Sequence, residues 1–359
     1  MDYVPILRFR DTEVKILNQM PKSALPLLEI VDEKWIKRLG QLKIPIDKGV
    51  MMELPCYLTE QQNKYSGGVE SLLNLSREST KIMKQAEFYL NNMKNLSIPV
   101  VSSPDKIAVD YGELVKAYNE LKPKAQKKGF EKIGVRVFVS RIQLSEQNKD
   151  NFRKLVKSMS EDDTLLLDVV EIDNLENNVL AQLKTLIDIL VDTKCKARVI
   201  LLNAFDVKDW RKDSHDFGPL LAVRFNLAGF GDFATIPRDE FEGGRGNTYV
   251  IRYFSSDDKV LHHFYSGKDF RDAKIKLTGN VVWKTALARG HLKNCDICEE
   301  INKKDSEWKT FWKIFRISHH INSMIKEVIP DIQKYKDIED LDTVGWDIVS
   351  KKGNLKKTG

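Results

Sequence analysis

The chain has 359 residues, of which 42% are hydrophobic and 31% are charged. This composition supports a large core, so the chain is expected to fold without disulfide staples, and the length suits one large α/β barrel or two ordinary domains. The net charge of +6 is modest, and it permits nucleic-acid contact without requiring it.

Cysteine usage and hydropathy point to a reducing cytoplasm. Four cysteines in a chain of this length do not form a disulfide framework. The N-terminal "MDYVPILRFR" lacks the apolar core of a signal peptide. No apolar run approaches the roughly 18 residues that a membrane span needs, so no membrane association is expected.

Apolar runs alternate with amphipathic stretches from the first residue onward. The runs begin at Tyr3, Leu25, Val50, Ile98, Ile133, Thr164, Arg198 and Phe230. Most of them are continuously apolar, which is typical of parallel strands covered on both faces. Helical spacing of apolar residues marks the segments 12–20, 111–121, 150–159 and 178–191.

Eight such units predict an α/β fold of the (β/α)8 TIM-barrel type, with its strands in residues 1–236. An open doubly wound sheet is the alternative. That fold would normally place a glycine-rich phosphate loop after the first strand, where this chain has "RFRDTEV" without any glycine. The sequence therefore favours the barrel.

The regular pattern ends after residue 236. Residues 237–306 are predicted to form an excursion containing an antiparallel β-hairpin, a further strand in "AKIKLTGNVVW" and a Cys-x-x-Cys motif. Residues 307–330 are predicted to be the final barrel helix, which closes the ring. Residues 331–359 form a C-terminal extension whose basic end is expected to be disordered.

Polar residues gather at the predicted C-terminal ends of the strands, where barrels of this type carry their functional groups. They are Arg8, Arg10, Glu29, Arg136, Asp168, Asn203 and Asp232. Buried opposite charges must pair, so these residues form either a ligand pocket or a closed ionic plug without catalysis. A pocket of this kind could hold Mg²⁺ or Mn²⁺ on the carboxylates, or a phosphate on the arginines. No motif for a catalytic nucleophile is present in the sequence.

Cys295 and Cys298 have the spacing of half a zinc site. His291 is a candidate third ligand, and His319 or His320 a candidate fourth. Two other interpretations stay open, namely reduced structural thiols and a redox pair. Zinc here would be structural and would pin the excursion to the last helix.

Three segments together resemble the Beta protein family of satellite phages and bacterial mobile elements. They are "YVPILRFRDTEVKIL" followed by "LPLLEIV"; "GFGDFATI"; and "CDIC" followed by Trp312, Phe315, His319, His320 and Ile321. The positions that match are Arg8, Glu29, Gly231, Asp232, Cys295, Cys298, His319 and His320. Arg8 replaces a lysine and Phe233 a tyrosine, and arginine is not equivalent to lysine at a bidentate site.

The namesake of this family is encoded beside a host-killing gene and restrains its product. The resemblance therefore implies a component of a phage-defence or toxin–antitoxin-like system, with a protein partner encoded nearby. A metal-assisted enzyme acting on a phosphorylated or nucleotide substrate is the first alternative, and a nucleic-acid binding protein is the second. The resemblance supplies no catalytic residue.

Overall fold

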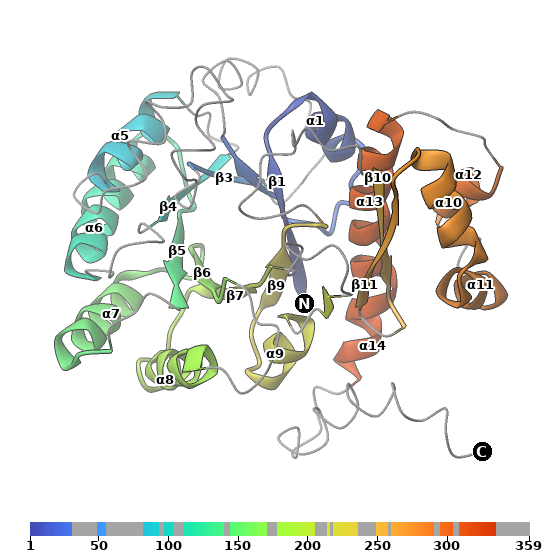
Figure 1. The fold of residues 1–359 in the computed structure, drawn as a ribbon. Coiled ribbons are helices and arrows are strands. Elements are labelled where there is room, and N and C mark those ends of the chain that lie inside the picture. Colours follow the sequence, from blue (N-terminus) through green and yellow to red (C-terminus); the bar gives the residue numbers. More distant parts are fainter. Residues whose placement is uncertain are drawn as a thin grey trace.

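The computed structural model describes residues 1–30, 49–54, 82–92, 97–102, 111–139, 144–170, 178–204, 214–215, 218–235, 249–257, 260–290, 295–303 and 309–334. Eight parallel strands close into a barrel in the order β1-β2-β3-β4-β5-β6-β7-β9 (Figure 1). They are β1 (Asp2–Arg8), β2 (Leu27–Glu29), β3 (Val50–Glu53), β4 (Ser97–Ser102), β5 (Gly134–Phe138), β6 (Thr164–Asp168), β7 (Arg198–Leu202) and β9 (Gly229–Asp232). The (β/α)8 prediction is confirmed, and the open doubly wound alternative is wrong.

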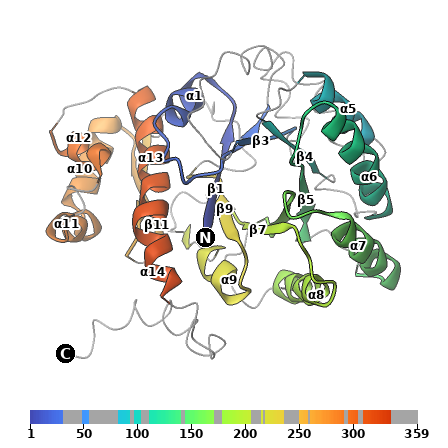
Figure 2. The ribbon, with the colours of Figure 1, turned by 180° about the vertical axis from the view of Figure 1, so that it is seen from behind.

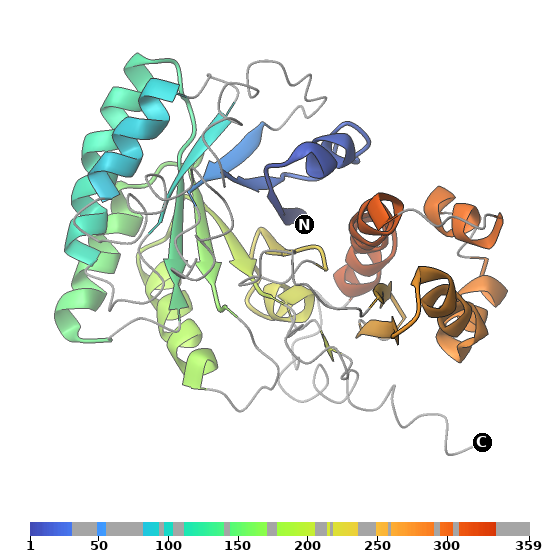
Figure 3. The same ribbon diagram turned by 45° about the horizontal axis from the view of Figure 1, so that its top comes forward.

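Helices cover the outside of the barrel (Figure 3). They are α1 (Asp11–Leu17), α5 (Ile82–Asn92), α6 (Tyr111–Lys127), α7 (Glu146–Ser158), α8 (Asn178–Asp192) and α9 (Gly218–Arg224). Each of the four segments with helical spacing overlaps one of these helices, whereas α5 and α9 were not predicted. Within the described residues, no helix has the length and apolar character needed to cross a bilayer.

Successive side chains along each barrel strand point alternately into the barrel and toward the surrounding helices, which gives two hydrophobic cores. Val4, Ile6, Leu166 and other side chains of the same parity fill the barrel interior. Their neighbours in sequence pack outward against the helices, as Leu7 and Leu167 do. A polar residue near the end of a strand therefore faces either the interior or the helix layer according to its parity.

An accessory unit follows the eighth barrel strand. The hairpin β10 (Tyr249–Ser255) and β11 (Val260–Ser266) is antiparallel as predicted, and β8 (Ser214–His215) pairs with β11. Three helices accompany this sheet, α10 (Phe270–Gly279), α11 (Val281–Ala288) and α12 (Asp296–Lys303). The additional strand predicted in "AKIKLTGNVVW" is wrong, because Asp269 and Asn280 cap two short helices there.

The last helix lies between the barrel and the accessory unit (Figures 1 and 2). It comprises α13 (Lys309–Ser323), a π-helical turn η4 (Met324–Val328) and α14 (Ile329–Gln333). Ile317 and Ile321 join the core around the barrel, whereas Trp312 and Phe315 join the accessory core. In addition, α13 packs on α1 and α14 packs on α9, so the last helix contacts helices from both ends of the barrel sequence. Residues 335–359 of the predicted tail lie outside the described residues.

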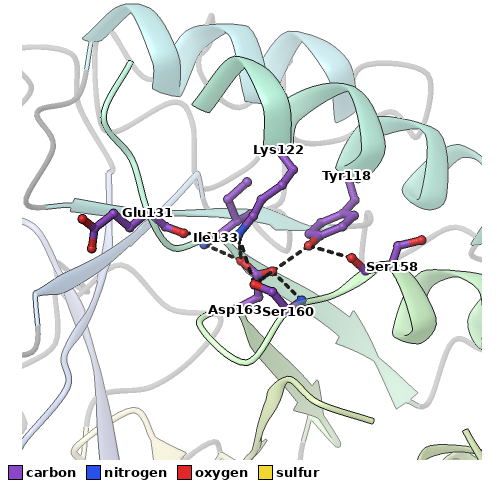
Figure 4. Close-up of polar contacts among 7 residues, drawn as sticks. All are labelled: Tyr118, Lys122, Glu131, Ile133, Ser158, Ser160 and Asp163. Atoms are coloured by element: carbon purple, nitrogen blue, oxygen red, sulfur yellow. Dashed lines mark hydrogen bonds and ion pairs between the residues drawn. The ribbon is translucent and has the colours of Figure 1, made fainter. Parts of the chain in front are cut away.

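Asp163 ties together several elements at the N-terminal face of the barrel (Figure 4). Its carboxylate accepts hydrogen bonds from the Ile133 and Ser160 backbone N–H groups, the Ser160 hydroxyl, Tyr118 Oη at 2.6 Å and Lys122 Nζ at 2.5 Å. Burial is the largest single influence on the pKa of Asp163 and raises it. The hydrogen bonds from Lys122, Tyr118 and Ser160 together outweigh burial and lower that pKa. Because active sites of (β/α)8 barrels lie at the opposite, C-terminal face, we interpret this cluster as a contribution to stability.

Candidate functional site

Three charged side chains stand side by side at the C-terminal mouth of the barrel. In the strand register, Arg8 of β1 is opposite Glu29 of β2, and Glu29 is opposite Glu53 of β3. All three side chains are buried. Because the strand register places these residues at the same level, one cation and two carboxylates lie next to one another at the barrel mouth.

Arg136 of β5 crosses the interior to meet these carboxylates. Its Nη1 is hydrogen-bonded to Glu53 Oε2 and lies 3.9 Å from Glu29 Oε1. Its Nε and Nη2 donate to Asp168 Oδ2 of β6, at 2.9 and 2.5 Å. The guanidinium also lies over the rings of Phe138 and Phe233, with centroids 5.0 and 5.9 Å away. Arg136 is therefore the central cation of a buried network.

The remaining oxygens of Glu53 and Asp168 also have partners. The Ser102 hydroxyl donates to Glu53 Oε1, and Asp168 Oδ1 accepts from the Val170 backbone N–H at 2.7 Å. Burial raises the pKa of Glu53, against the opposing effect of Arg136 and of the Ser102 hydrogen bond. Both oxygens of Glu53 and both of Asp168 thus accept hydrogen bonds within the network, as the ionic-plug interpretation expects.

Asp232, which was predicted to belong to the mouth network, lies elsewhere. Its carboxylate accepts from Tyr3 Oη at 3.1 Å, from the Ala234 backbone N–H at 2.6 Å, and contacts His320 Nε2 at 2.9 and 3.0 Å. The reason is strand parity, because Phe233 fills the interior and Asp232 therefore points to the helix layer. Asp232 fastens α13 to the barrel.

Two other predicted mouth residues have less central positions. Asn203 is buried just after β7, and its backbone N–H donates to the Gly231 carbonyl at 2.9 Å. Arg10 is half-buried immediately before α1.

A second group of charges lies where β1 and α1 meet α13. Glu13 of α1 is fully buried and pairs with Lys313 Nζ at 2.8 Å. Burial lowers the pKa of Arg316 to about 10, with Glu13 opposing this change and Arg8 adding to it. Burial likewise lowers the pKa of Lys313, which Arg10 and Arg8 depress further. Glu13 is therefore the buried counter-charge of the cations on this part of α13.

The accessory unit carries a cluster that could hold a metal ion. The ligand atoms of Cys295, Cys298 and His319 lie within 4.8 Å of one another, and all three residues are buried. His319 Nδ1 lies 3.6 Å from Cys295 Sγ and 3.3 Å from Cys298 Sγ. Within the ranges that the model describes, this is the one group of three such residues, and it does not include the mouth carboxylates.

The surroundings of His319 orient it as a ligand. Its Nε2 lies 2.8 Å from the Phe254 carbonyl oxygen, which can only accept, so Nε2 carries the proton and the Nδ1 lone pair faces the two thiols. The imidazole is stacked between Tyr253 and Phe315, at centroid distances of 4.6 and 5.6 Å. Burial, and then Cys295, raise the pKa of the Cys298 thiol. A cation at this position would favour the thiolates instead.

His320 and His291 were also predicted as metal ligands. His320 does not reach the thiols, because its Nε2 is bound to Asp232 on the opposite side of α13. His291 lies outside the described residues.

Sequence reasoning missed Glu53, Glu13, Lys313 and Arg316. Glu53 had a readable signal, since "VMMEL" places a charge at the end of an apolar strand just as "LLLDV" does for Asp168. The other three had no comparable signal, because charged residues on helices are ordinarily exposed.

No protein-family model matches this chain, and no curated protein matches its sequence.

Proposed function

We propose that this protein is a binding component of a phage-defence or toxin–antitoxin-like system, whose barrel mouth engages a protein partner or a ligand. The resemblance to the Beta protein family suggests the biological setting. The observation that favours binding over catalysis is the contact set of Arg136. Its guanidinium donates hydrogen bonds to Glu53 and Asp168. These carboxylates are therefore already paired, whereas binding of Mg²⁺ or Mn²⁺, or an acid–base mechanism, would need them.

The metal cluster supports this role by fixing the last helix. We propose that Cys295, Cys298 and His319 bind zinc, because two thiols and one imidazole nitrogen are the donors that zinc prefers. A structural site is four-coordinate, so one further ligand completes it. A reducing cytoplasm is the proposed compartment, since it keeps both cysteines as thiols that can bind the ion.

Co-expression with the adjacent genes tests the proposed function. The chain should relieve the growth defect caused by a toxic neighbouring product and should co-purify with that product in stoichiometric amounts. A matched pair of variants separates the mouth from the rest of the surface. Arg10→Glu at the mouth should reduce co-purification, whereas Arg153→Glu on α7 should not. Absence of both growth rescue and co-purification would remove the proposal.

A further inference from the structure

A cleft of about 460 Å³ lies on the N-terminal face of the barrel, opposite the mouth. It opens where α8 and α9 end, just before β7 and β9, and these two helices are neighbours in the helix ring (Figures 1 and 2). Its walls are mostly apolar, and Leu190, Phe225 and Leu227 are among the side chains that form them. Small-molecule sites have this character, namely a hollow of roughly 300–1,000 Å³ with apolar walls and a few polar groups.

Both helices end in the same way beside the cleft. Lys194 follows α8 with a φ of 52°, and Asn226 follows α9 with a φ of 49°. In each case the N–H group of this residue and that of the next one bond to carbonyl oxygens of the last helical turn, at 2.8–3.0 Å. These bonds satisfy the carbonyls, so the helix ends present mainly side chains to the cleft. Asparagine adopts this left-handed conformation readily and lysine does not, so the backbone holds Lys194 at the rim against its own preference.

Lys194 supplies the positive charge at this cleft. Arg198, the other cation of the lining, forms an ion pair with Asp2. Within the part of the chain that the structure describes, the Lys194 ammonium has no ion pair or hydrogen bond, and no carboxylate lines the cleft. The end of α8 carries only about half a unit of negative charge, and Arg224 in the last turn of α9 offsets the end of that helix. The rim is therefore positive beside an apolar hollow.

We propose that this cleft binds a small carboxylic acid with an apolar chain, of the medium-chain fatty acid class. The chain packs on the apolar walls and covers Val191, which is 70% exposed. The carboxylate pairs with Lys194 at the rim, where a single compact ammonium suits a single carboxylate. The cleft lies on the face opposite the mouth, so this inference does not depend on the proposed binding of a partner there.

The test is titration calorimetry and thermal unfolding of the full chain with hexanoate, octanoate and decanoate, at neutral pH and constant ionic strength. A ligand of the native state raises Tm with its concentration. Each pair of added CH₂ groups that the cleft buries should tighten binding roughly fifteenfold. Octanol is the matched neutral ligand. It should bind about two- to fivefold more weakly than octanoate, which is the size of an exposed ion pair.

Three variants locate the site. Lys194→Gln should reduce octanoate affinity to that of octanol and leave octanol binding unchanged. Lys196→Gln is the matched control, because Lys196 is exposed two residues further on and does not line the cleft. Ala228→Leu should fill the cleft and abolish binding of both ligands. Bound octanoate should also slow alkylation of the Cys195 thiol in the lining, followed by peptide mass spectrometry, and this measurement needs no variant that has to fold.

Each of four results would overturn the proposal. The first is no saturable binding and no Tm increase with millimolar decanoate. The second is equal affinity for octanoate and octanol, which would remove the carboxylate from the ligand class. The third is equal weakening of octanoate binding in the Lys194 and Lys196 variants. The fourth is unchanged octanoate binding by a folded Ala228→Leu variant, which would place the bound acid elsewhere on the surface.

Discussion

Replacing Arg136 with methionine tests whether the mouth network is a closed ionic plug. The variant removes the cation from Glu53 and Asp168 while keeping most of the side-chain volume. Breaking a buried ion pair by removing one partner costs about 3–5 kcal/mol, and two carboxylates lose their partner here. Since domains are stable by only about 5–15 kcal/mol, Arg136→Met should consume a large part of the free energy of unfolding.

The pH dependence of this loss gives a second check. Burial already raises the pKa of Glu53, and removing Arg136 should raise it further. A carboxyl group with a raised pKa binds protons more tightly in the folded state, so the folded state gains stability as pH falls. The defect should therefore be largest above neutral pH and should shrink toward pH 5.

Urea unfolding followed by tryptophan fluorescence, at pH 5 and pH 8, measures both effects. Adding Glu53→Gln to the Arg136→Met variant should recover part of the lost stability, because it removes one of the buried charges that lack a partner. A loss below about 1 kcal/mol, the size expected of an exposed pair, or a loss independent of pH, would refute the closed network. Either result would also remove the main support for a binding role at the mouth.

Three further predictions concern the other clusters. Asp163→Asn should destabilise the N-terminal face by about 3–5 kcal/mol at neutral pH. Because the pKa of Asp163 is lowered in the folded state, its contribution is fully present above the unfolded pKa. The difference from the variant in urea unfolding should begin to shrink below roughly pH 4 and be lost as pH falls through the lower folded pKa. Cys298→Ser should abolish metal content in elemental analysis, whereas Cys195→Ser, outside the cluster, should leave about one equivalent; equal content in both variants would contradict the site. Asp232→Asn should lower stability by about 1.5–3 kcal/mol through its weakened bond to His320. Hydrogen exchange should then rise in α13, and unchanged exchange there would contradict the fastening role.

The barrel was predictable because its strands are covered on both faces. Continuous apolar runs such as "TLLLD" admit few other interpretations in a chain that also shows helical spacing between them. A charge inside such a run must find a partner, which is why Arg136, Asp168 and Glu29 could be expected to meet. The strand pairing in the structure adds Glu53, which lies opposite Glu29 and which the sequence analysis did not include in this group.

Two predictions failed because local pattern was ambiguous. In "AKIKL" the alternation of lysine with apolar residues imitates a strand, yet Ile275 is 60% exposed while Ala273 and Leu277, four apart, are buried. Asp232 follows the same logic, since "GFGDF" places one phenylalanine on each face of β9. Which face receives the carboxylate depends on the barrel register, and no short-range rule fixes that.

The tandem histidines show how a helix can join two units with adjacent residues. Successive residues on a helix point about 100° apart, since one turn takes 3.6 residues, so His319 and His320 cannot easily bind the same ion. His319 turns to the thiols of the accessory unit, and His320 turns to Asp232 of the barrel. Phe254 of β10 contacts both, through its carbonyl oxygen to His319 and through its ring to His320, with centroids 4.6 Å apart. A metal ion held by His319 would therefore restrain the same turn of α13 that Asp232 holds through His320.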